Sequence, residues 1–470
     1  MYFISNIAQY LVNVNNFDYN YLSFQQKNAV IRQLLERNGG SMIYNGMYRM
    51  PLIPFRRSKM KKTRYPIDYS AILYLAQMQP NHSNVYRFAL TMRDPICPEH
   101  LQKAADRVCA RFPTIFSGFR PGLFSCCMVP ADAAPRVAED PGTLRTLSDA
   151  ELRSCAYRIF YSGNQVIIEA FHALTDGFGA VTSLKALAAE YLHLHHGVHS
   201  PERQEMLESG EPDWETELQD AYLDYTQAKG VRLPNRHAYQ LRGENRDWNV
   251  KVSTEQFSTG MLLGISRRYG VSLTAMLSCL MAEAIMEVQN RHTAPKKKKP
   301  VRIMVPIDLR RLFPSRTLRN FILYALPTME CGSILDSREL RMHSFHSQLK
   351  QQVSRKVLED QISANVNTQR LLIFRIIPLK LKLAAMRLAY RFFGESNSSI
   401  TLTNLGAVTF SDELKQHICG MDVLLTPRCQ SPYNCGIISC GETTSISITR
   451  FGAQPELETL FYEKLRRVLQ

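Results

Sequence analysis

The sequence predicts an α/β protein built from two successive lobes, with mixed sheets, flanking helices and a cleft between the lobes. Three observations lead to this fold class. The chain has 470 residues, more than one hydrophobic core ordinarily accommodates. Segments with the two-residue period of strands alternate with segments that have the 3.6-residue period of helices. These segments fall into two sets, one on each side of a charged stretch with few apolar runs.

The composition suggests four parts. Residues 1–63 are rich in Asn, Tyr and Arg with weak periodicity, so we expect a poorly specified N-terminal extension and assign it no function. Residues 64–199 form the predicted N-terminal lobe and 248–470 the C-terminal lobe. Residues 200–247 mix acidic residues and prolines, as linkers do.

The first lobe is predicted element by element. Tyr86, Phe88, Leu90 and Met92 alternate within 84–93, which indicates a half-buried strand. Pro98 suits the first turn of the helix that follows. Two strand-like runs joined by a Ser-Gly-Asn turn predict a hairpin over 156–173, and an amphipathic helix then ends near Gly197.

The second lobe repeats the theme. We expect a short strand after Trp248, helices from about Glu255 and Ser272, further helices within 337–393, and a last helix over 455–469. The predicted strands are 301–306, 399–404, 434–440 and 444–450.

Charge and cysteine usage limit the class of protein. The formal net charge is +15, but Lys and Arg are spread along the chain and no nucleic-acid-binding motif is present, so we expect no nucleic-acid partner. The run Lys296, Lys297, Lys298, Lys299 and the stretch 56–64 are interpreted as solvated loops, while a positive surface also suits a phosphate-bearing substrate or an acidic carrier protein. The eleven cysteines include no CxxC pair, which suggests neither a disulfide framework nor a zinc site and favours a reducing compartment. With no secretory leader and no apolar run of about 20 residues, we expect a cytoplasmic protein without a transmembrane segment. Two lobes within one chain favour a monomer.

The most informative stretch is FHALTDGFG, residues 171–179. His172 lies at the end of the second hairpin strand, and a neutral imidazole there can take a proton from an attacking hydroxyl, amine or thiol. Asp176 falls where the next helix begins and can cap its free amides. Gly177 and Gly179 permit close backbone approach. A histidine before an Asp-Gly turn is, in most proteins, a packing or capping residue, so the motif alone leaves both interpretations open.

This stretch resembles the HxxxDG motif of the superfamily that contains chloramphenicol acetyltransferases, condensation domains, wax ester synthases and alcohol acetyltransferases. Three further stretches are similar to that superfamily in order and spacing: RYPIDYSAILYLAQ (64–77), VPIDLRRLFPSRTLRNF (305–321) and TLTNLGAV (401–408). The likeness covers residues 64–470 and looks nearest the alcohol acetyltransferase and polyketide-associated acyltransferase type. It implies a chloramphenicol-acetyltransferase-like fold with an inter-lobe tunnel.

The resemblance also implies roles for single residues. His172 would be the general base, Asp176 would hold the motif loop through an ion pair with an arginine, and Gly177 would keep the channel open. Phe171 stands where many condensation domains have a first histidine, which disfavours that branch. The DFGWG motif of the plant acyl-CoA acyltransferases, another branch of this superfamily, is missing, which disfavours that branch too. The arginine partner of Asp176 is left open, with Arg310 one candidate.

Attack on a thioester builds negative charge on oxygen, which a hydrogen-bond donor must stabilise. Thr403 and Asn404, on the strand that resembles the superfamily's crossing strand, are the candidate donors. Arg310 and Asn320 are candidates for the channel wall or for the fold itself.

No metal ion or bound cofactor is expected. The one histidine-rich segment, with His193, His195, His196 and His199, lies beside Gly197 at a predicted helix C-terminus, where histidine is favoured for its charge.

The predicted function is acyl transfer from a thioester, with acyl-coenzyme A as co-substrate, to a small alcohol or amine. Two alternatives remain: an enzyme that takes its acyl group from an acyl carrier protein, and a binding or scaffolding protein of the same fold that has no turnover.

Overall fold

The structure is a computed structural model that describes residues 64–79, 83–208, 214–241, 249–332, 337–370, 376–428, 431–452 and 455–470. By its internal contacts the chain divides into Met1–Lys61 and Lys62–Gln470. All elements described below belong to the second unit. The predicted extension, 1–63, lies outside the described residues.

The helices and strands up to residue 241 are β1 (Tyr65–Pro66), α3 (Ala71–Gln77), β2 (Val85–Met92), α4 (Pro98–Arg111), β3 (Ser117–Pro121), β4 (Cys126–Pro130), β5 (Ala138–Glu139), α5 (Asp149–Ser154), β6 (Tyr157–Ser162), β7 (Gln165–Phe171), α6 (Gly177–His196), α7 (Pro201–Arg203), η3 (Gln204–Glu208), α8 (Trp214–Glu217) and η4 (Ala221–Leu223).

From residue 249 onward they are β8 (Val250–Ser258), α9 (Thr259–Arg268), α10 (Leu273–His292), η5 (Pro295–Lys297), β9 (Val301–Asp308), η6 (Leu309–Arg311), β10 (Ile322–Ala325), β11 (Thr328–Met329), α11 (Arg338–Gln352), α12 (Arg355–Gln369), α14 (Leu379–Ala389), η7 (Tyr390–Gly394), η8 (Glu395–Asn397), β12 (Ile400–Val408), α15 (Asp412–Lys415), β13 (Ile418–Leu425), β14 (Tyr433–Cys440), β15 (Thr443–Phe451) and α16 (Glu456–Leu469).

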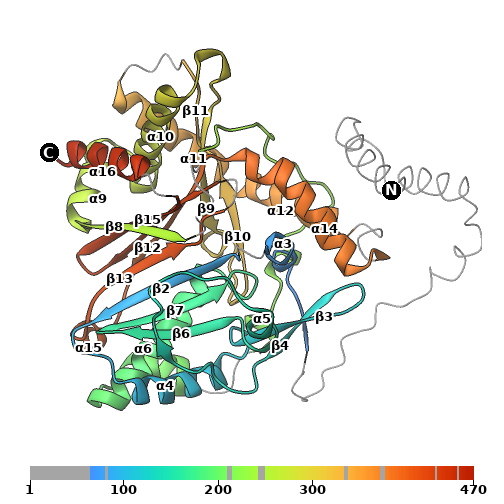
Figure 1. Cartoon of the computed structure of the whole chain (residues 1–470), viewed down its shortest axis with the longest axis vertical. Helices are drawn as coiled ribbons and strands as arrows, with labels where there is room; N and C mark the ends of the chain where they lie inside the picture. Colours follow the sequence, from blue (N-terminus) through green and yellow to red (C-terminus); the bar gives the residue numbers. More distant parts are fainter. Residues whose placement is uncertain are drawn as a thin grey trace, which may run out of the picture. The chain divides into compact units, whose positions relative to one another are not determined.

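The first lobe is built on a five-stranded sheet of order β13-β2-β7-β6-β5. The predicted hairpin is present as β6 and β7, which pair antiparallel. Helices α4 and α6 pack together against this sheet, and apolar side chains of α4, α6, β2 and β7 share one buried core (Figure 1). Strand β2 is buried at every position but one, and since successive side chains point to opposite faces, both faces of the sheet are shielded along this strand.

The second lobe is built on a seven-stranded mixed sheet of order β10-β9-β12-β14-β15-β8, with β11 also paired to β9. Its core is separate from that of the first lobe and is formed by α10, α16 and the inward residues of β9, β12, β14 and β15. Figure 1 shows α9, α10 and α16 together beside this sheet. A third, three-stranded sheet joins β1, β4 and β3.

The sequence did not predict strand β13, and its position changes the lobe boundary. Although β13 belongs to the second half of the chain, it pairs antiparallel with β2 from Met421↔Leu90 to Leu425↔Tyr86. It also crosses β14 closely, since a Cβ on Gly436 would lie 2.6 Å from the carbonyl oxygen of Val423. Residues 418–425 therefore complete the sheet of the first lobe, and the C-terminal lobe is not one uninterrupted segment.

The stretch that the composition marked as a linker is partly structural. Ala221 and Tyr222 are buried in a core with Phe313 and Phe321. The Tyr222 hydroxyl donates to the carbonyl of Ile322 at 2.7 Å and accepts from its N–H at 2.9 Å. This part of residues 200–247 therefore supports the loop that ends at Phe321.

Within the described residues, no single helix is long and apolar enough to cross a membrane. Helices α9 and α10, bent by 85° at their junction, pass that test only as a pair and only on length and composition.

Candidate active site

His172 follows the last residue of β7 and is fixed through its main chain and its ring. Its backbone N–H donates to the carbonyl of Asn84 at 2.8 Å, which extends the pairing of β7 with β2 by one step. The imidazole stacks on Tyr74 of α3, with ring centroids 4.2 Å apart and planes 12° apart. Tyr86 of β2 meets it edge-on at 5.1 Å. Two aromatic rings therefore hold a half-buried imidazole.

Asn320 fixes the tautomer of His172. The Asn320 side chain places Nδ2 2.8 Å from the His172 carbonyl oxygen and Oδ1 3.0 Å from the His172 Nδ1. A carbonyl oxygen only accepts, so the amide nitrogen must face it, and the amide oxygen is left to accept from the ring. His172 Nδ1 must then carry the hydrogen, and the lone pair is on Nε2.

The surroundings also keep this imidazole neutral. Burial lowers the pKa of His172 below 6.5, even though the hydrogen bonds to its own carbonyl and to Asn320 and the charges of Asp176 and Asp68 favour protonation. A neutral ring with a lone pair on Nε2 is the state in which histidine acts as a general base at neutral pH.

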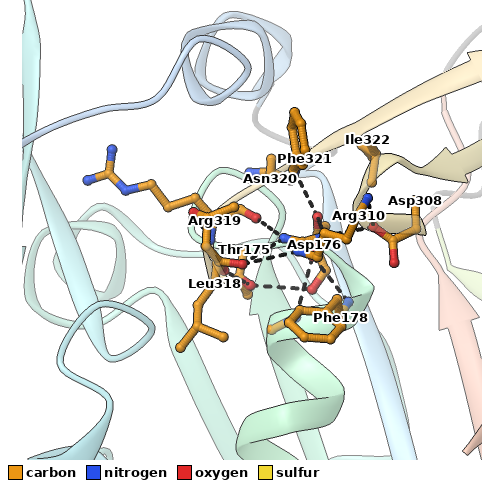
Figure 2. Close-up of polar contacts among 12 residues, drawn as sticks. Thr175, Asp176, Phe178, Asp308, Arg310, Leu318, Arg319, Asn320, Phe321 and Ile322 are labelled. Atoms are coloured by element: carbon orange, nitrogen blue, oxygen red, sulfur yellow. Dashed lines mark hydrogen bonds and ion pairs between the residues drawn. The ribbon is translucent and has the colours of Figure 1, made fainter. Parts of the chain in front are cut away.

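Asp176 closes the loop after His172 and starts helix α6. It is the N-cap residue, and its Oδ1 accepts from the N–H groups of Phe178 and Gly179 at 3.1 and 3.4 Å. Its Oδ2 accepts from the N–H of Phe321 at 2.8 Å and from Arg310 at 2.8 Å (Figure 2). Only 1% of the Asp176 side chain is exposed, so the carboxylate contacts other protein groups and not solvent.

Arg310 is the arginine that pairs with Asp176. Its Nη1 also contacts Asp308 at 3.0 Å, and its Nη2 donates to the Arg319 carbonyl (Figure 2). Both Nε and Nη2 donate to the carbonyl of Thr317. Burial acts to lower the pKa of Arg310, but the charges of Asp176 and Asp308 more than offset it, and the pKa is raised. Every guanidinium nitrogen has a protein partner, so Arg310 ties the 309–321 loop to the motif loop, and the geometry favours this role over substrate contact.

The two motif glycines permit two close approaches. A Cβ on Gly179 would lie 2.1 Å from Thr175 Oγ1 and 2.6 Å from the Leu318 carbonyl oxygen. Those two groups are themselves hydrogen-bonded at 2.6 Å, which makes Gly179 part of the junction between the lobes. A Cβ on Gly177 would meet only the tip of Leu405 of β12, at 2.7 Å.

Strand β12 brings the two predicted oxyanion donors into the second lobe's sheet. The Asn404 Oδ1 accepts from the N–H of Gly406 and its Nδ2 donates to Thr274 Oγ1, both at 3.0 Å, where the register of β12 shifts. Among the described residues no hydrogen-bond partner is found for the Thr403 hydroxyl. Neither side chain is hydrogen-bonded to His172 within the described part of the chain, so the oxyanion role stays a prediction, for which Thr403 is the freer group.

Helix α3, which carries Tyr74, is anchored by a buried polar cluster. Asp68 Oδ1 accepts from the N–H groups of Ser70 and Ala71 at the start of the helix. Asp220 Oδ2 accepts from the N–H of Tyr69 at 2.8 Å. The guanidinium of Arg319 lies within electrostatic range of both carboxylates without a direct ion pair, and each of the three side chains has a buried polar atom with no hydrogen-bond partner.

The four consecutive lysines lie elsewhere. Lys296–Lys299 form part of the lining of a cavity of about 1230 Å³, together with Tyr239, Tyr433 and Phe451. His172 and Asn320 are not among its lining residues. The cavity is therefore not the environment of the proposed base.

The motif pointed to His172 and Asp176, but two site residues were not recognised for what they do. Tyr74 was not singled out, because the stretch 64–77 was noted only for its resemblance to the superfamily. Asn320 was considered as a wall or fold residue, and its contact with His172 spans 148 positions. No local pattern marks either residue, because their roles depend on the packing of distant segments.

Comparisons with known proteins bear on the fold. No family model matches the chain and no curated protein matches it. Among solved structures, TRI101 of Fusarium sporotrichioides complexed with coenzyme A and T-2 is similar, with a TM-score of 0.57 and 12% identity over 86% of this chain and 99% of that one. The trichothecene 15-O-acetyltransferase TRI3 of the same organism has a TM-score of 0.55 and 9% identity over 88% and 96% of the two chains.

The first condensation domain of the CDA synthetase matches with a TM-score of 0.50 and 13% identity over 87% of this chain and 96% of that one. At such identities the likeness is one of fold. It agrees with the two lobes, the mixed sheets and the flanking helices predicted from the sequence. The chain thus has the two-lobed, chloramphenicol-acetyltransferase-like fold of these acetyltransferases and this condensation domain.

Proposed function

We propose that this protein is an acyltransferase that moves an acyl group from a thioester, acyl-coenzyme A, to an alcohol or amine, with His172 as the general base. The observation that carries the proposal is the double hydrogen bond of Asn320 to His172, which assigns the ring hydrogen to Nδ1 and the lone pair to Nε2. The lowered pKa of His172 supports the role of general base, because it keeps the ring neutral and so leaves the lone pair on Nε2 available.

The reaction then needs one proton to move twice. Nε2 takes the proton from the acceptor O–H or N–H as that group attacks the thioester carbonyl. The tetrahedral intermediate collapses by breaking the C–S bond, and the departing thiolate receives the same proton from Nε2. The Thr403 hydroxyl is the proposed donor to the oxyanion. Removal of one such donor costs about 10²–10³ in kcat where this has been measured.

Asp176 of the motif and its partner Arg310 hold the loops of the site in position. Asp176 and Arg310 keep the loop after His172 against the 309–321 loop that delivers Asn320. They are positioning residues, since all their hydrogen bonds are within the protein. The similar structures support a thioester substrate of the coenzyme A type, because one was solved with coenzyme A and another is named as an O-acetyltransferase.

The test is release of free thiol by the full-length chain from a panel of acyl-coenzyme A donors with pooled alcohols and amines. His172→Gln is compared with the wild type, and His343→Gln, an exposed histidine on α11, serves as the matched control. Loss of the general base is expected to reduce acceptor-dependent release by about 10²–10⁴-fold, with the control unchanged.

Equal rates for His172→Gln and the wild type would overturn the mechanism. If the folded wild type releases no thiol from any acyl-coenzyme A, the same assay is repeated with acyl groups on a carrier protein. Activity found only there would select the carrier-dependent alternative, and charge reversal at the exposed Lys296 and Lys297 is then expected to weaken it.

A further inference from the structure

Far from His172, the structure gathers metal-ligating side chains from three segments. They surround the start of α4, the end of α6 and the residue before β13. We call this set the histidine corner; its members are Asp94, Cys97, His100, His195, His196 and His417.

The better-shielded half of the histidine corner is Cys97, His100 and His195. Each offers one ligand atom, and these three atoms lie within 4.8 Å of one another. The Nδ1 atoms of His100 and His195 face each other at 2.9 Å. All three residues are half-buried. Cys97 is one of the cysteines that form no disulfide in the described part of the chain, so its sulfur is free to act as a ligand.

This spacing suits a single tetrahedral ion. Zn²⁺ binds histidine nitrogen at about 2.0–2.1 Å and cysteine sulfur at about 2.3 Å, which places two nitrogens about 3.3 Å apart. Small ring rotations would move the two Nδ1 atoms from 2.9 Å to that separation. A thiolate with two imidazoles is a ligand set that selects Zn²⁺ over Mg²⁺ or Ca²⁺. Water can fill the fourth position, and the Cys97 sulfur, which donates to the Glu99 carboxylate at 3.2 Å, would give up that hydrogen when it binds the ion as a thiolate.

Neighbouring groups orient the ligands, as is usual around bound metals. The N–H of Cys97 donates to the Tyr191 hydroxyl at 3.0 Å, and the Tyr191 ring stacks on His195 with 19° between the planes. His195 lies in the last turn of α6, where the helix dipole favours a positive charge.

The second half of the histidine corner is more exposed. His196 Nε2 lies 3.3 Å from an Asp94 carboxylate oxygen, and its ring stacks on His417 at 4.8 Å. The rings of His195 and His196 are 4.5 Å apart, so the two triads adjoin. Having no thiolate and more water contact, this triad is expected to bind metal more weakly.

We propose that Cys97, His100 and His195 bind a Zn²⁺ ion that clamps the start of α4 to the end of α6. Helix α6 has 20 residues and begins next to the motif loop, so the ion would lie about 30 Å from that end of the helix. Its role would be structural, independent of acyl transfer. No sequence pattern marked the site, because the four histidines near Gly197 were interpreted alone, while Cys97 and His100 lie about a hundred positions earlier.

The test uses the full-length, tag-free chain, stripped of metal by a chelator and kept reduced. Titration with Co²⁺ is expected to produce a thiolate-to-cobalt charge-transfer absorption that saturates at one equivalent and disappears when Zn²⁺ is added. Cys97→Ser should abolish this band. His100→Gln and His195→Gln should each weaken binding at least about ten-fold, while His193→Gln, on the same turn of α6 but outside both triads, should change neither.

A second measurement separates binding from misfolding. Zn²⁺ is expected to raise the Tm of the wild type and of His193→Gln but not that of Cys97→Ser. No charge-transfer band in the folded wild type, or an identical band in Cys97→Ser, would overturn the proposal. A band lost in His417→Gln but kept in His100→Gln would also overturn it, since the ion would then lie in the exposed triad.

Discussion

At the scale of single residues, the proposed chemistry depends on which ring nitrogen of His172 carries hydrogen. Asn320 makes that choice because its two polar atoms are held by one residue, accepting from Nδ1 and donating to the carbonyl. Burial is the largest effect on the pKa of His172, and the charges of Asp176 and Asp68 only partly oppose it. The identity of residue 320 should therefore set the pH dependence of the reaction.

Replacing Asn320 with Asp tests this dependence. A carboxylate next to Nδ1–H stabilises the imidazolium, so the pKa of His172 should rise and the acidic limb of the kcat/KM profile should move to higher pH. In the wild type this limb is expected below pH 6.5, because the pKa is lowered from that value. The profile is measured as thiol release over the range from about pH 5 to about pH 9.

Asn320→Ala provides the uncharged comparison, since it removes both hydrogen bonds without adding a carboxylate. It is expected to lower kcat/KM across the whole range and to leave the limb below pH 6.5. A profile for Asn320→Asp that coincides in position with the wild type would contradict the assignment of His172 as the titrating base.

Part of this site was predicted from the sequence. His172 and Asp176 were predicted from one continuous motif, in which both residues lie within five positions. The ion pair of Asp176 was expected, with Arg310 as one candidate, and the structure has that pair. Tyr74 contacts His172 through the packing of α3, and a stacking contact between distant segments leaves no periodic trace in the sequence.

At the scale of elements, the junction of the two lobes depends on the first turn of α6. Thr175 donates to the Leu318 carbonyl at 2.6 Å, and Gly179 lies against both groups. Gly177, two residues earlier, meets only a flexible leucine tip. The two glycines of one motif therefore provide a matched pair of substitutions.

Gly179→Ala is expected to lower the free energy of unfolding by about 1–3 kcal/mol, as overpacking does, because the backbone carbonyl of Leu318 cannot move aside cheaply. Gly177→Ala should cost less, since rotation of Leu405 relieves the contact. Urea unfolding followed by circular dichroism measures both. Equal losses, or a greater loss for Gly177→Ala, would contradict this account of the junction.

Periodicity predicted most elements, but it did not predict that a strand from the second half of the chain joins the sheet of the first lobe. Strands β2, β6, β7, β14 and β15 and helices α4 and α6 lie close to their predicted bounds. The helix expected from about Glu255 was placed too early, because β8 extends to Ser258 and α9 begins at Thr259. Strand β13 was missed because its apolar pattern is irregular, with a register shift between Ile418 and Gly420. The pairing of β13 with β2 depends on tertiary packing. A lobe boundary drawn at one position along the chain cannot predict such a pairing.

At the scale of the whole described unit, three distant segments meet in the polar cluster of Asp68, Asp220 and Arg319. Asp68 precedes α3 and accepts from the N–H groups at its start. Asp220 belongs to the region first interpreted as a linker, and Arg319 lies on the loop that carries Asn320 to His172. Burial and then the charge of Asp68 raise the pKa of Asp220 to about 7, although the hydrogen bond from Tyr69 and the charge of Arg319 oppose the shift. Burial likewise raises the pKa of Asp68. Proton uptake by this cluster is thus coupled to the folding of three segments.

This coupling predicts how stability changes with pH. Asp220 has a pKa of about 7 in the folded chain and about 3.9 when unfolded, so the folded state binds its proton more tightly. The stabilisation from that proton is complete below about pH 4, is lost as pH rises to about 7, and changes little beyond. Asp220→Asn keeps an oxygen to accept from the Tyr69 N–H and has no proton to lose, so its advantage over the wild type should grow between about pH 5 and about pH 7 and then level off. Urea unfolding at intervals from about pH 5 to about pH 8 measures the difference, and parallel stability curves for the two proteins would show that Asp220 does not hold a proton in the folded state.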